Sequence, residues 1–403
     1  MKRLKLFFSD IKDTWFSHII VLIIMIASVF SFARAYGRYR YISDPYHLLE
    51  SAGIENSLYF EEKNLEYMGE NYTSEITELT RKIEQFPAVE YASGIDSVTI
   101  LCQNGGFSLS IFDEGIKGLY PKTLQGEWFT DAVNEDGSIN AVMTDEYISG
   151  VEVGDVLEVY LAGNNDVSIT IKITGILPYY SQLPSLSAQA SEMLTEYLYN
   201  AKGALLVQNN PIIEDLKKTY SQSFSNDGNF IVIFRDGASQ SDIDECKTFL
   251  GSNGGYHEMS NILQQSKENM DLALKKNMIS PLFYLFIAFM AFISITALTI
   301  YKKMDHQAVY LLIGCSKRRM LTDVLTQMGI ICLIAGALNI YLTSNYGLLT
   351  KLKLLQSGFV IFDKKIIIVI VSIILVMFIF IMLTAVLLTK RKSPVELLRK
   401  FEN

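Results

Sequence analysis

Residues 366–389 read IIIVIVSIILVMFIFIMLTAVLLT, a run of apolar residues without one charged side chain. An α-helix rises 1.5 Å per residue, so this run is long enough to cross a hydrocarbon core of roughly 30 Å. Three earlier runs have the same character and almost no interior charge: Trp15 to Ala33, Ile279 to Tyr301 and Asp323 to Thr343. The sequence therefore predicts an integral membrane protein with four transmembrane helices.

Charge divides the chain in the same way as hydropathy. Between Tyr36 and Met278 there are 16 basic and 36 acidic residues, a balance of −20, and since the whole chain carries −8, the rest carries +12. Basic clusters flank the runs on one side of the expected membrane, at 2–12, 302–319 and 390–392. The positive-inside rule places these clusters in the cytoplasm and the acidic region outside. The short loop between the third and fourth runs also contains four lysines, which weakens the bias, so the even number of spans supports this orientation as well.

The first apolar run has two interpretations. A basic start and the small residues around Ala33 resemble a secretory signal with its cleavage site. However, apolar residues before the run recur at helical spacing, at Leu4, Phe7, Phe8, Ile11 and Trp15. This pattern is typical of an amphipathic helix on the inner membrane surface, and it favours a retained first span.

The region between the first two spans predicts an α+β domain. A strand at 57–60, a helix at 72–86 and a strand at 89–101 form one β-α-β unit, and a strand at 229–234 with a helix at 239–250 indicates a second. Short β-branched runs between them, at 140–143, 156–161, 169–176 and 204–207, predict a small β subdomain inserted between two α/β halves. The tract at 178–202 is expected to be a mobile loop or a helix over the insert.

The expected fold class is an α-helical membrane protein with four transmembrane helices plus an extracytoplasmic α+β domain. Its parts, in chain order, are an amphipathic helix at 1–14, span one at 15–35, the extracytoplasmic domain at 36–278, span two at 279–301, a cytoplasmic loop at 302–322, span three at 323–344, an outer loop at 345–365, span four at 366–389 and a tail helix at 390–403. Within the domain, the halves are expected near 55–105 and 226–260, the insert near 106–225 and a stalk helix at 262–278. That stalk continues toward the second span, interrupted by Pro281.

The sequence lacks the common short motifs for catalysis and nucleotide binding. The chain contains no G-x-x-x-x-G-K-[ST] loop, no H-E-x-x-H, no C-x-x-C and no G-x-S-x-G. Its four histidines are scattered over regions expected on different sides of the membrane, which speaks against a shared metal site. We therefore expect a non-catalytic chain that holds no cofactor of its own. Of the four cysteines, only Cys102 and Cys246 lie in the expected outer domain, and their spacing leaves open whether they form a disulfide.

Two stretches on the expected cytoplasmic side have the marks of ordered helices. In the loop YKKMDHQAVYLLIGCSKRRM, Asp305 is expected to start a helix, Gly314 to end it and Ser316 to cap the next. In the tail KRKSPVELLRK, Ser393 is a capping residue, Pro394 suits the first helical position and Glu396 completes a capping box. A capped helix directly after the last span indicates a binding partner below the membrane.

These stretches resemble the signatures of the FtsX/MacB-like ABC transporter permeases. The loop is similar to their "reigvlkaiGaskrqi" motif, and S-P-V-E-L-L-R at 393–399 is similar to the P-x-E-x-L-R tail of the MacB branch. Shorter likenesses lie in the outer domain, at F-P-A-V-E (86–90), L-Q-G-E-W-F (124–129) and V-G-D (153–155). The sequence departs from the pattern at Pro87-Ala88, which lacks the usual glycine, and at Cys315, where alanine is common.

The resemblance implies a permease that works by mechanotransmission in a bacterial plasma membrane, with both termini cytoplasmic. A separate dimeric ABC ATPase would bind ATP and move the membrane helices, and the outer domain would follow. The residues implied to face that ATPase are Asp305, His306, Tyr310, Gly314, Ser316, Pro394 and Glu396. Further implied partners are a second permease copy and an extracytoplasmic adaptor protein, with the lipid bilayer around the spans and no nucleic acid.

Three functions share this architecture. The first is efflux of, or resistance to, peptides, toxins or antibiotics, and the acidic outer domain suits cationic peptides. The second is an FtsX-like regulator that switches a cell-wall hydrolase, and the third is lipoprotein extraction. The large outer domain with its insert and the P-x-E-x-L-R-like tail favour the first.

Overall fold

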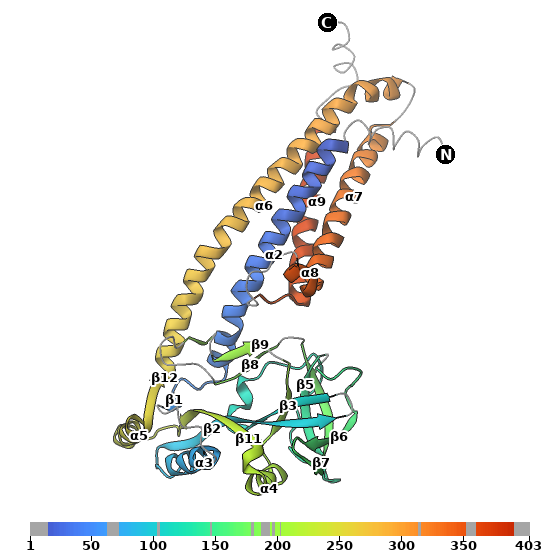
Figure 1. Cartoon of the computed structure of the whole chain (residues 1–403). Coiled ribbons are helices and arrows are strands. Elements are labelled where there is room, and N and C mark those ends of the chain that lie inside the picture. Colours follow the sequence, from blue (N-terminus) through green and yellow to red (C-terminus); the bar gives the residue numbers. More distant parts are fainter. Residues whose placement is uncertain are drawn as a thin grey trace. The chain divides into compact units, whose positions relative to one another are not determined.

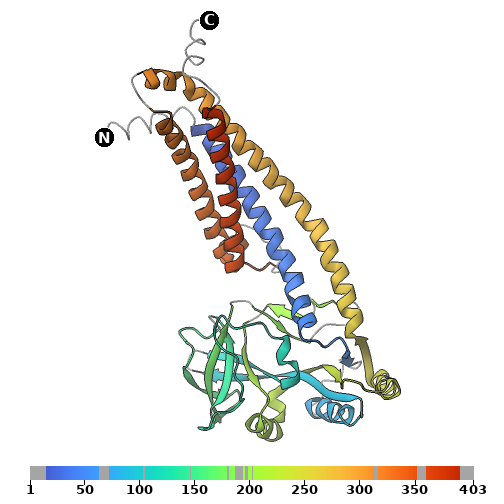
Figure 2. The same ribbon diagram turned by 180° about the vertical axis from the view of Figure 1, so that it is seen from behind.

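The computed structural model describes residues 15–62, 72–102, 105–145, 147–178, 181–186, 194–195, 198–201, 203–312, 316–351 and 360–390. The chain divides into two compact units (Figures 1 and 2). We call Met1–Arg40 with Leu272–Asn403 the helical unit, and Tyr41–Asp271 the β unit. Each unit is described by itself below.

The prediction of four helices that are long and apolar enough to cross a membrane is confirmed. They belong to α2 (Trp15–Ser51), α6 (Met259–Leu312), α7 (Lys317–Ser344) and α9 (Lys364–Lys390), with the short α8 (Tyr346–Lys351) after α7. Two helices extend well past their expected spans: α2 continues beyond residue 35 to Ser51, and α6 continues beyond residue 301 to Leu312. The expected interruption at Pro281 does not occur, because α6 passes through it without ending.

Small residues allow close packing within the helical unit. A Cβ added to Gly336 of α7 would lie 3.1 Å from the Ile374 side chain of α9, so glycine lets these two helices approach closely. At the end of α2, a Cβ on Gly37 would collide with the carbonyl oxygen of Ile361, and the Ile361 amide donates to the Gly37 carbonyl at 3.3 Å. The buried Arg40 then pairs with Asp363 at 2.7 Å, so the segment before α9 is held against α2 by both contacts.

The β unit has one large sheet, in which the two α/β halves interleave. Its first half comprises β1 (Ser57–Glu62), α3 (Tyr72–Ile83) and β2 (Val89–Cys102), and its second comprises β11 (Phe224–Phe234), α5 (Gln240–Asn253) and β12 (Gly254–Glu258). The strand order is β12-β1-β11-β2, so each half places one strand between the two strands of the other. The expected halves exist as β-α-β units, but they form a single sheet with one core, in which Phe60 stacks on Phe230 at 4.6 Å.

The inserted strands close into a barrel that shares β2 with this sheet. The ring runs through β2, β3 (Gly105–Phe112), β10 (Leu205–Gln208), β5 (Ile139–Thr144), β7 (Asn164–Leu177) and β6 (Val156–Leu161), which pairs back with β2. Its interior is filled by a separate apolar cluster that includes Ile100, Leu109, Ile171 and Leu205. The insert is therefore a distinct core, as expected, but it extends the large sheet instead of forming its own. Shorter elements complete the unit: η1 (Glu114–Leu119), β4 (Gln125–Gly126), α4 (Pro211–Thr219) and η3 (Ser221–Ser223).

The tract at 178–202, expected to be a mobile loop or a helix, contains a buried hairpin. Strands β8 (Gln182–Pro184) and β9 (Tyr199–Ala201) pair with each other. The Gln182 amide donates to the carbonyl of Tyr41 in α2 at 2.8 Å, and the Thr195 amide donates to Ser266 of α6 at 2.9 Å. The carbonyl of Leu186 accepts from Tyr59 at 2.9 Å and from Asn229 at 2.7 Å. We call residues 181–186, 194–195 and 198–201 the strap, because they join both helices to the sheet within the β unit.

Candidate functional site

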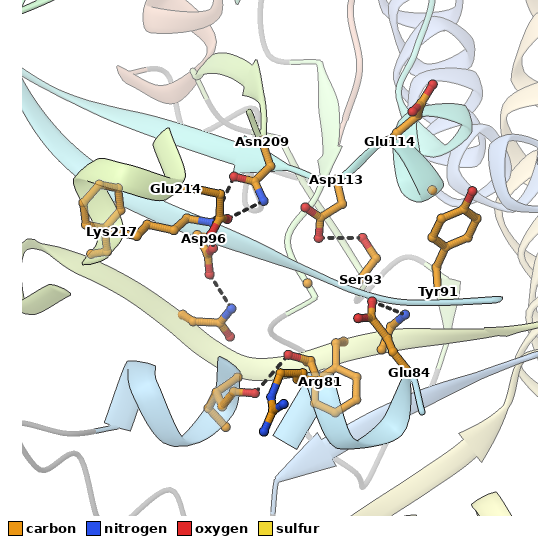
Figure 3. Close-up of a pocket in the computed structure, with 18 of the residues that line it drawn as sticks. Arg81, Glu84, Tyr91, Ser93, Asp96, Asp113, Glu114, Asn209, Glu214 and Lys217 are labelled. Carbon is orange, nitrogen blue, oxygen red and sulfur yellow. Dashed lines mark hydrogen bonds and ion pairs between the residues drawn. The ribbon is translucent and has the colours of Figure 1, made fainter. Parts of the chain in front are cut away.

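A cleft of about 740 Å³ opens between α3, α4 and the sheet of the β unit (Figure 3). Its walls come from five places in the chain: α3 with the turn after it, the first half of β2, Asp113 with the start of η1, residues between Asn209 and Ser221, and β11. Aromatic and aliphatic side chains lie beside charged ones in these walls. The cleft therefore combines apolar surface with a few convergent polar groups, as ligand sites do.

Sheet topology brings two of its polar residues together. Strands β3 and β10 are parallel, with Phe112 opposite Gln208. Asp113 and Asn209 directly follow these two residues, and the Asn209 amide still donates to the Phe112 carbonyl at 2.8 Å. Because the carboxyl ends of parallel strands meet at one edge, both side chains reach the same end of the cleft.

The cation of Lys217 is the centre of a polar network in the cleft. Its Nζ lies 2.6 Å from Asp96 and 3.3 Å from both Glu214 and Asn209. This lysine is positioned by α4, whose start is fixed by the side chain of Asn210 and by a proline at the first helical position. Asp96 in turn accepts from Asn226 at 2.5 Å, so the network joins α4 to strands β2 and β11.

The network shifts the pKa values of its members. Burial acts to lower the pKa of Lys217, but the neighbouring Asp96 and Glu214 outweigh it and raise that pKa. Burial acts to raise the pKa of Glu214, but the hydrogen bond from Asn209 and the charge of Lys217 outweigh burial and lower that pKa. Asp113 differs, because burial raises its pKa more than nearby Lys217 and Asn209 lower it. Asp113 makes no ion pair within the described residues, and its carboxylate accepts from Ser93 at 3.3 Å.

One side of β2 lines the cleft over four successive residues, Tyr91 to Gly94. The Ala92 amide points away from β11 and donates to the exposed Glu84 side chain at 3.4 Å. The Tyr91 ring lies against Gly115, where an added Cβ would approach the ring to 3.2 Å. Tyr91 nevertheless keeps 45% of its surface exposed, so its ring is available to a ligand.

The residues expected to face an ATPase lie elsewhere in the chain. Asp305, His306 and Tyr310 fall in the last turns of α6, which reaches them without a break, so Asp305 does not begin a new helix. Ser316 is the residue before α7, with extended backbone. Gly314, Pro394 and Glu396 lie outside the described residues. The ATPase-facing surface therefore stays a prediction.

The open question about the cysteines has an answer in the structure. Cys102 and Cys246 are both free. Cys102 packs against the barrel core, whereas Cys246 is fully buried in the core of the interleaved halves. The two thiols belong to different cores and do not form a disulfide.

Sequence reasoning missed the cleft, although two local signals for it exist. Asp113 follows a strand directly, and Asn209-Asn210-Pro211 is a helix start placed directly after another strand. Neither signal shows that the two strands are parallel neighbours. The site exists because these strands pair, and their pairing is a long-range contact that local sequence does not reveal.

Two solved structures are among those that are similar to part of this chain. No protein-family model matches the chain, and no curated protein matches it. The periplasmic region of MacB from Actinobacillus actinomycetemcomitans is 12% identical, with a TM-score of 0.31, over 53% of this chain and 92% of that structure. The extracellular domain of the noncanonic ABC-type transporter YknZ from Gram-positive bacteria is 14% identical, with a TM-score of 0.27, over 50% of this chain and 96% of that structure. These values do not assign the chain to a family.

Proposed function

We propose that this chain is the permease subunit of a MacB-like ABC transporter and works by mechanotransmission. A separate cytoplasmic ATPase dimer would bind and hydrolyse ATP, and this chain would convert its movement into movement of the β unit. The observation that carries the proposal is the unbroken helix α6. It contains residues of both units and one of the four candidate spans.

The length of α6 suits the transmission of force. Its 54 residues correspond to about 80 Å at the helical rise of 1.5 Å per residue. An α-helix satisfies its backbone hydrogen bonds internally and is stiff along its axis, so displacement at one end reaches the other. Residues 302–312 form its last turns, which include three of the residues proposed to contact the ATPase.

The strap connects both long helices to the sheet. Within the β unit it contacts α2 through Tyr41, α6 through Ser266 and the sheet through Tyr59 and Asn229. Buried hydrogen bonds of this kind are costly to break, because the separated groups lose their partners without gaining water. Movement of either helix is therefore passed to the sheet.

The cytoplasmic contact surface is proposed to comprise Asp305, His306, Tyr310, Gly314, Ser316, Pro394 and Glu396. Two copies of the chain would pair in a bacterial plasma membrane, with both termini cytoplasmic, and an adaptor protein would join them outside. The proposed role is efflux of, or resistance to, peptides, toxins or antibiotics. An FtsX-like regulator of cell-wall hydrolases and a lipoprotein-extraction permease are the alternatives.

Co-purification from the native host tests this function. The full chain in mild detergent is expected to retain an ABC ATPase, identified by mass spectrometry and by ATP hydrolysis. A variant that lacks residues 393–403 and carries Gly314→Pro is expected to lose it. The matched control is Lys218→Met, which alters an exposed lysine of the β unit and keeps the ATPase. A folded wild-type chain that retains no ATPase would refute the proposal, and an adaptor or a hydrolase in the complex would separate efflux from wall regulation.

A further inference from the structure

The first half of β2 has an open edge. Strand β11 pairs with one side of β2 along Val89 to Gly94, and β3 pairs with the other side only from Ile95 onward. Within the described part of the chain, no strand occupies that other side between Val89 and Gly94. An edge without a paired strand presents backbone donors and acceptors to an extended chain that comes beside it.

The contact at Ala92 shows which backbone groups face the open side. Its amide donates to the Glu84 carboxylate and not to β11. In an antiparallel pair, successive residues alternate between the two sides, so Ala92 and Gly94 both point their backbone groups outward. Glu84 therefore occupies the position that the carbonyl of an added strand would take, and its side chain is exposed and free to move away.

The groove beside this edge is shaped for a peptide. One wall is α3 with the turn that follows it, where Ile76, Thr80 and Glu84 recur every four residues and so lie on one side. The other wall begins at Gly115, against which the half-exposed Tyr91 ring lies. A groove between a strand edge and a helix is a recurring site for extended peptides, in which the backbone gives affinity and the walls give selectivity.

The charges of the groove favour a basic peptide. Five acidic residues line it, Glu84, Asp96, Asp113, Glu114 and Glu214, against three basic ones, Arg81, Lys217 and Lys218. Lys217 is already engaged by Asp96 and Glu214. Asp113 sits next to Ser93 of the edge strand without an ion pair in the described residues, so it is placed to receive a cation from a peptide on that edge.

We propose that the cleft binds a free, extended, cationic peptide, which adds as a strand to the open edge of β2 and places a basic side chain at Asp113. Its backbone carbonyl replaces Glu84 at the Ala92 amide, and its side chains contact Tyr91 and the α3 face. The inference depends on the β unit alone, so it holds whether or not the chain partners an ATPase.

Fluorescence anisotropy with the full chain in lipid nanodiscs tests this proposal. The probe is a labelled hexapeptide, Val-Thr-Lys-Val-Thr-Val, blocked at both ends. One control peptide carries N-methyl groups at alternate residues, which remove the backbone N–H donors needed for strand pairing. The other control peptide carries norleucine in place of lysine. The wild-type chain is expected to bind the probe saturably and to bind the N-methylated peptide at least about fivefold more weakly, since a lost hydrogen bond changes affinity by that order.

Variants of the chain locate the site. Ala92→Pro removes the outward amide but leaves the pairing with β11, and proline is tolerated on an open edge, so binding is expected to weaken about fivefold or more. Asp113→Asn is expected to weaken binding of the lysine probe about fivefold and to leave the norleucine peptide unchanged. Tyr91→Ala is compared with Tyr160→Ala, because Tyr160 is a similarly exposed tyrosine on β6 outside the cleft. The Tyr160→Ala chain is expected to bind the probe as wild type does.

The contrary outcomes are clear. Equal binding of the probe and its N-methylated form by the wild-type chain would overturn strand addition without reference to any variant. Equal effects of the Tyr91 and Tyr160 substitutions would overturn the location. Absence of saturable binding by a wild-type chain with an intact thermal transition would overturn the proposal as a whole, while the ATPase co-purification would still report separately on the permease function.

Discussion

The ion-pair network of Lys217 allows a quantitative prediction for the substitution Lys217→Met. Methionine fills a similar volume but leaves Asp96 and Glu214 without their cation. Breaking a buried pair by removing one partner costs about 3–5 kcal/mol, and a fully exposed pair is worth less than about 1 kcal/mol. The Lys217 and Asp96 side chains keep 18% and 21% of their surface exposed, so an intermediate cost is appropriate. We expect a loss of about 2 kcal/mol in the free energy of unfolding of the β unit.

Thermal unfolding of the purified full chain, followed by the signal of the β unit, measures this loss. For a domain of this size, about 2 kcal/mol corresponds to a decrease in Tm of roughly 4–8 °C. The matched control is Lys218→Met, because Lys218 is a neighbour in α4 whose side chain is 73% exposed and pairs with the exposed Asp215. That control is expected to leave Tm unchanged.

The same substitution has a predicted pH dependence. The pKa of Glu214 is lower in the folded state than its ordinary 4.5, because the Asn209 hydrogen bond and the Lys217 charge outweigh burial. A lowered carboxyl pKa contributes stability that is present above the unfolded pKa and is lost as pH falls through the folded pKa. The difference in stability between wild type and Lys217→Met should therefore have its full size at pH 7 and shrink below about pH 4.5. A Tm equal to that of wild type at pH 7, or a difference that grows on acidification, would refute the reasoning.

Three further predictions concern packing and reactivity. Tyr59→Phe removes one of two donors to the Leu186 carbonyl and should destabilise the β unit by about 1 kcal/mol in thermal unfolding. Gly37→Ala should displace the segment before α9, since its Cβ would collide with the Ile361 carbonyl oxygen, and hydrogen exchange at the Ile361 amide should speed up. Burial raises the pKa of Cys246 to about 11, so this thiol should stay unmodified by maleimide in the native chain and react only after unfolding.

Each of these predictions has its own contrary result. Tyr91→Phe alters an exposed tyrosine and serves as the control for Tyr59→Phe, and equal losses in the two variants would remove the special role of the strap. Gly329→Ala is the control for Gly37→Ala, because its Cβ would lie 3.5 Å from Phe378, an ordinary contact distance. If the Ile361 amide exchanged equally fast in both variants, the predicted collision at Gly37 would be contradicted. Modification of Cys246 by maleimide in the folded chain, at the rate seen after unfolding, would contradict the burial of this thiol.

Local elements of the fold were readable from the sequence, and their assembly was not. The alternation of Val156–Leu161 predicted a strand that the structure places at those residues, because one face of that strand is buried. The return of β6 to β2 pairs Leu161 with Ile100, and the interleaving of the halves pairs Tyr59 with Ile231. Such contacts join residues far apart in the sequence, and no local periodicity encodes them.

Helix length was the second limit of the sequence reasoning. The apolar character of α2 fades after Ala35, which suggested the end of a span. The helix continues to Ser51, because its backbone hydrogen bonds do not depend on apolar side chains and its polar turns are held by contacts such as Gln182 to Tyr41. The cleft was missed for the same reason as the barrel, since Asp96, Asp113 and Lys217 meet only after β3 and β10 become parallel neighbours.

In the proposed mechanism, movement of the membrane helices reaches the β unit through α6. Hydrogen exchange at strap residues 181–186, measured in the isolated ATPase complex with and without ATP, tests it most directly. We expect ATP to change exchange there in the wild-type complex. Three glycines inserted after Lys276 of α6 should abolish the change while the ATPase stays bound. An ATP-bound wild-type complex whose strap exchanges as in the nucleotide-free state would contradict this mechanism.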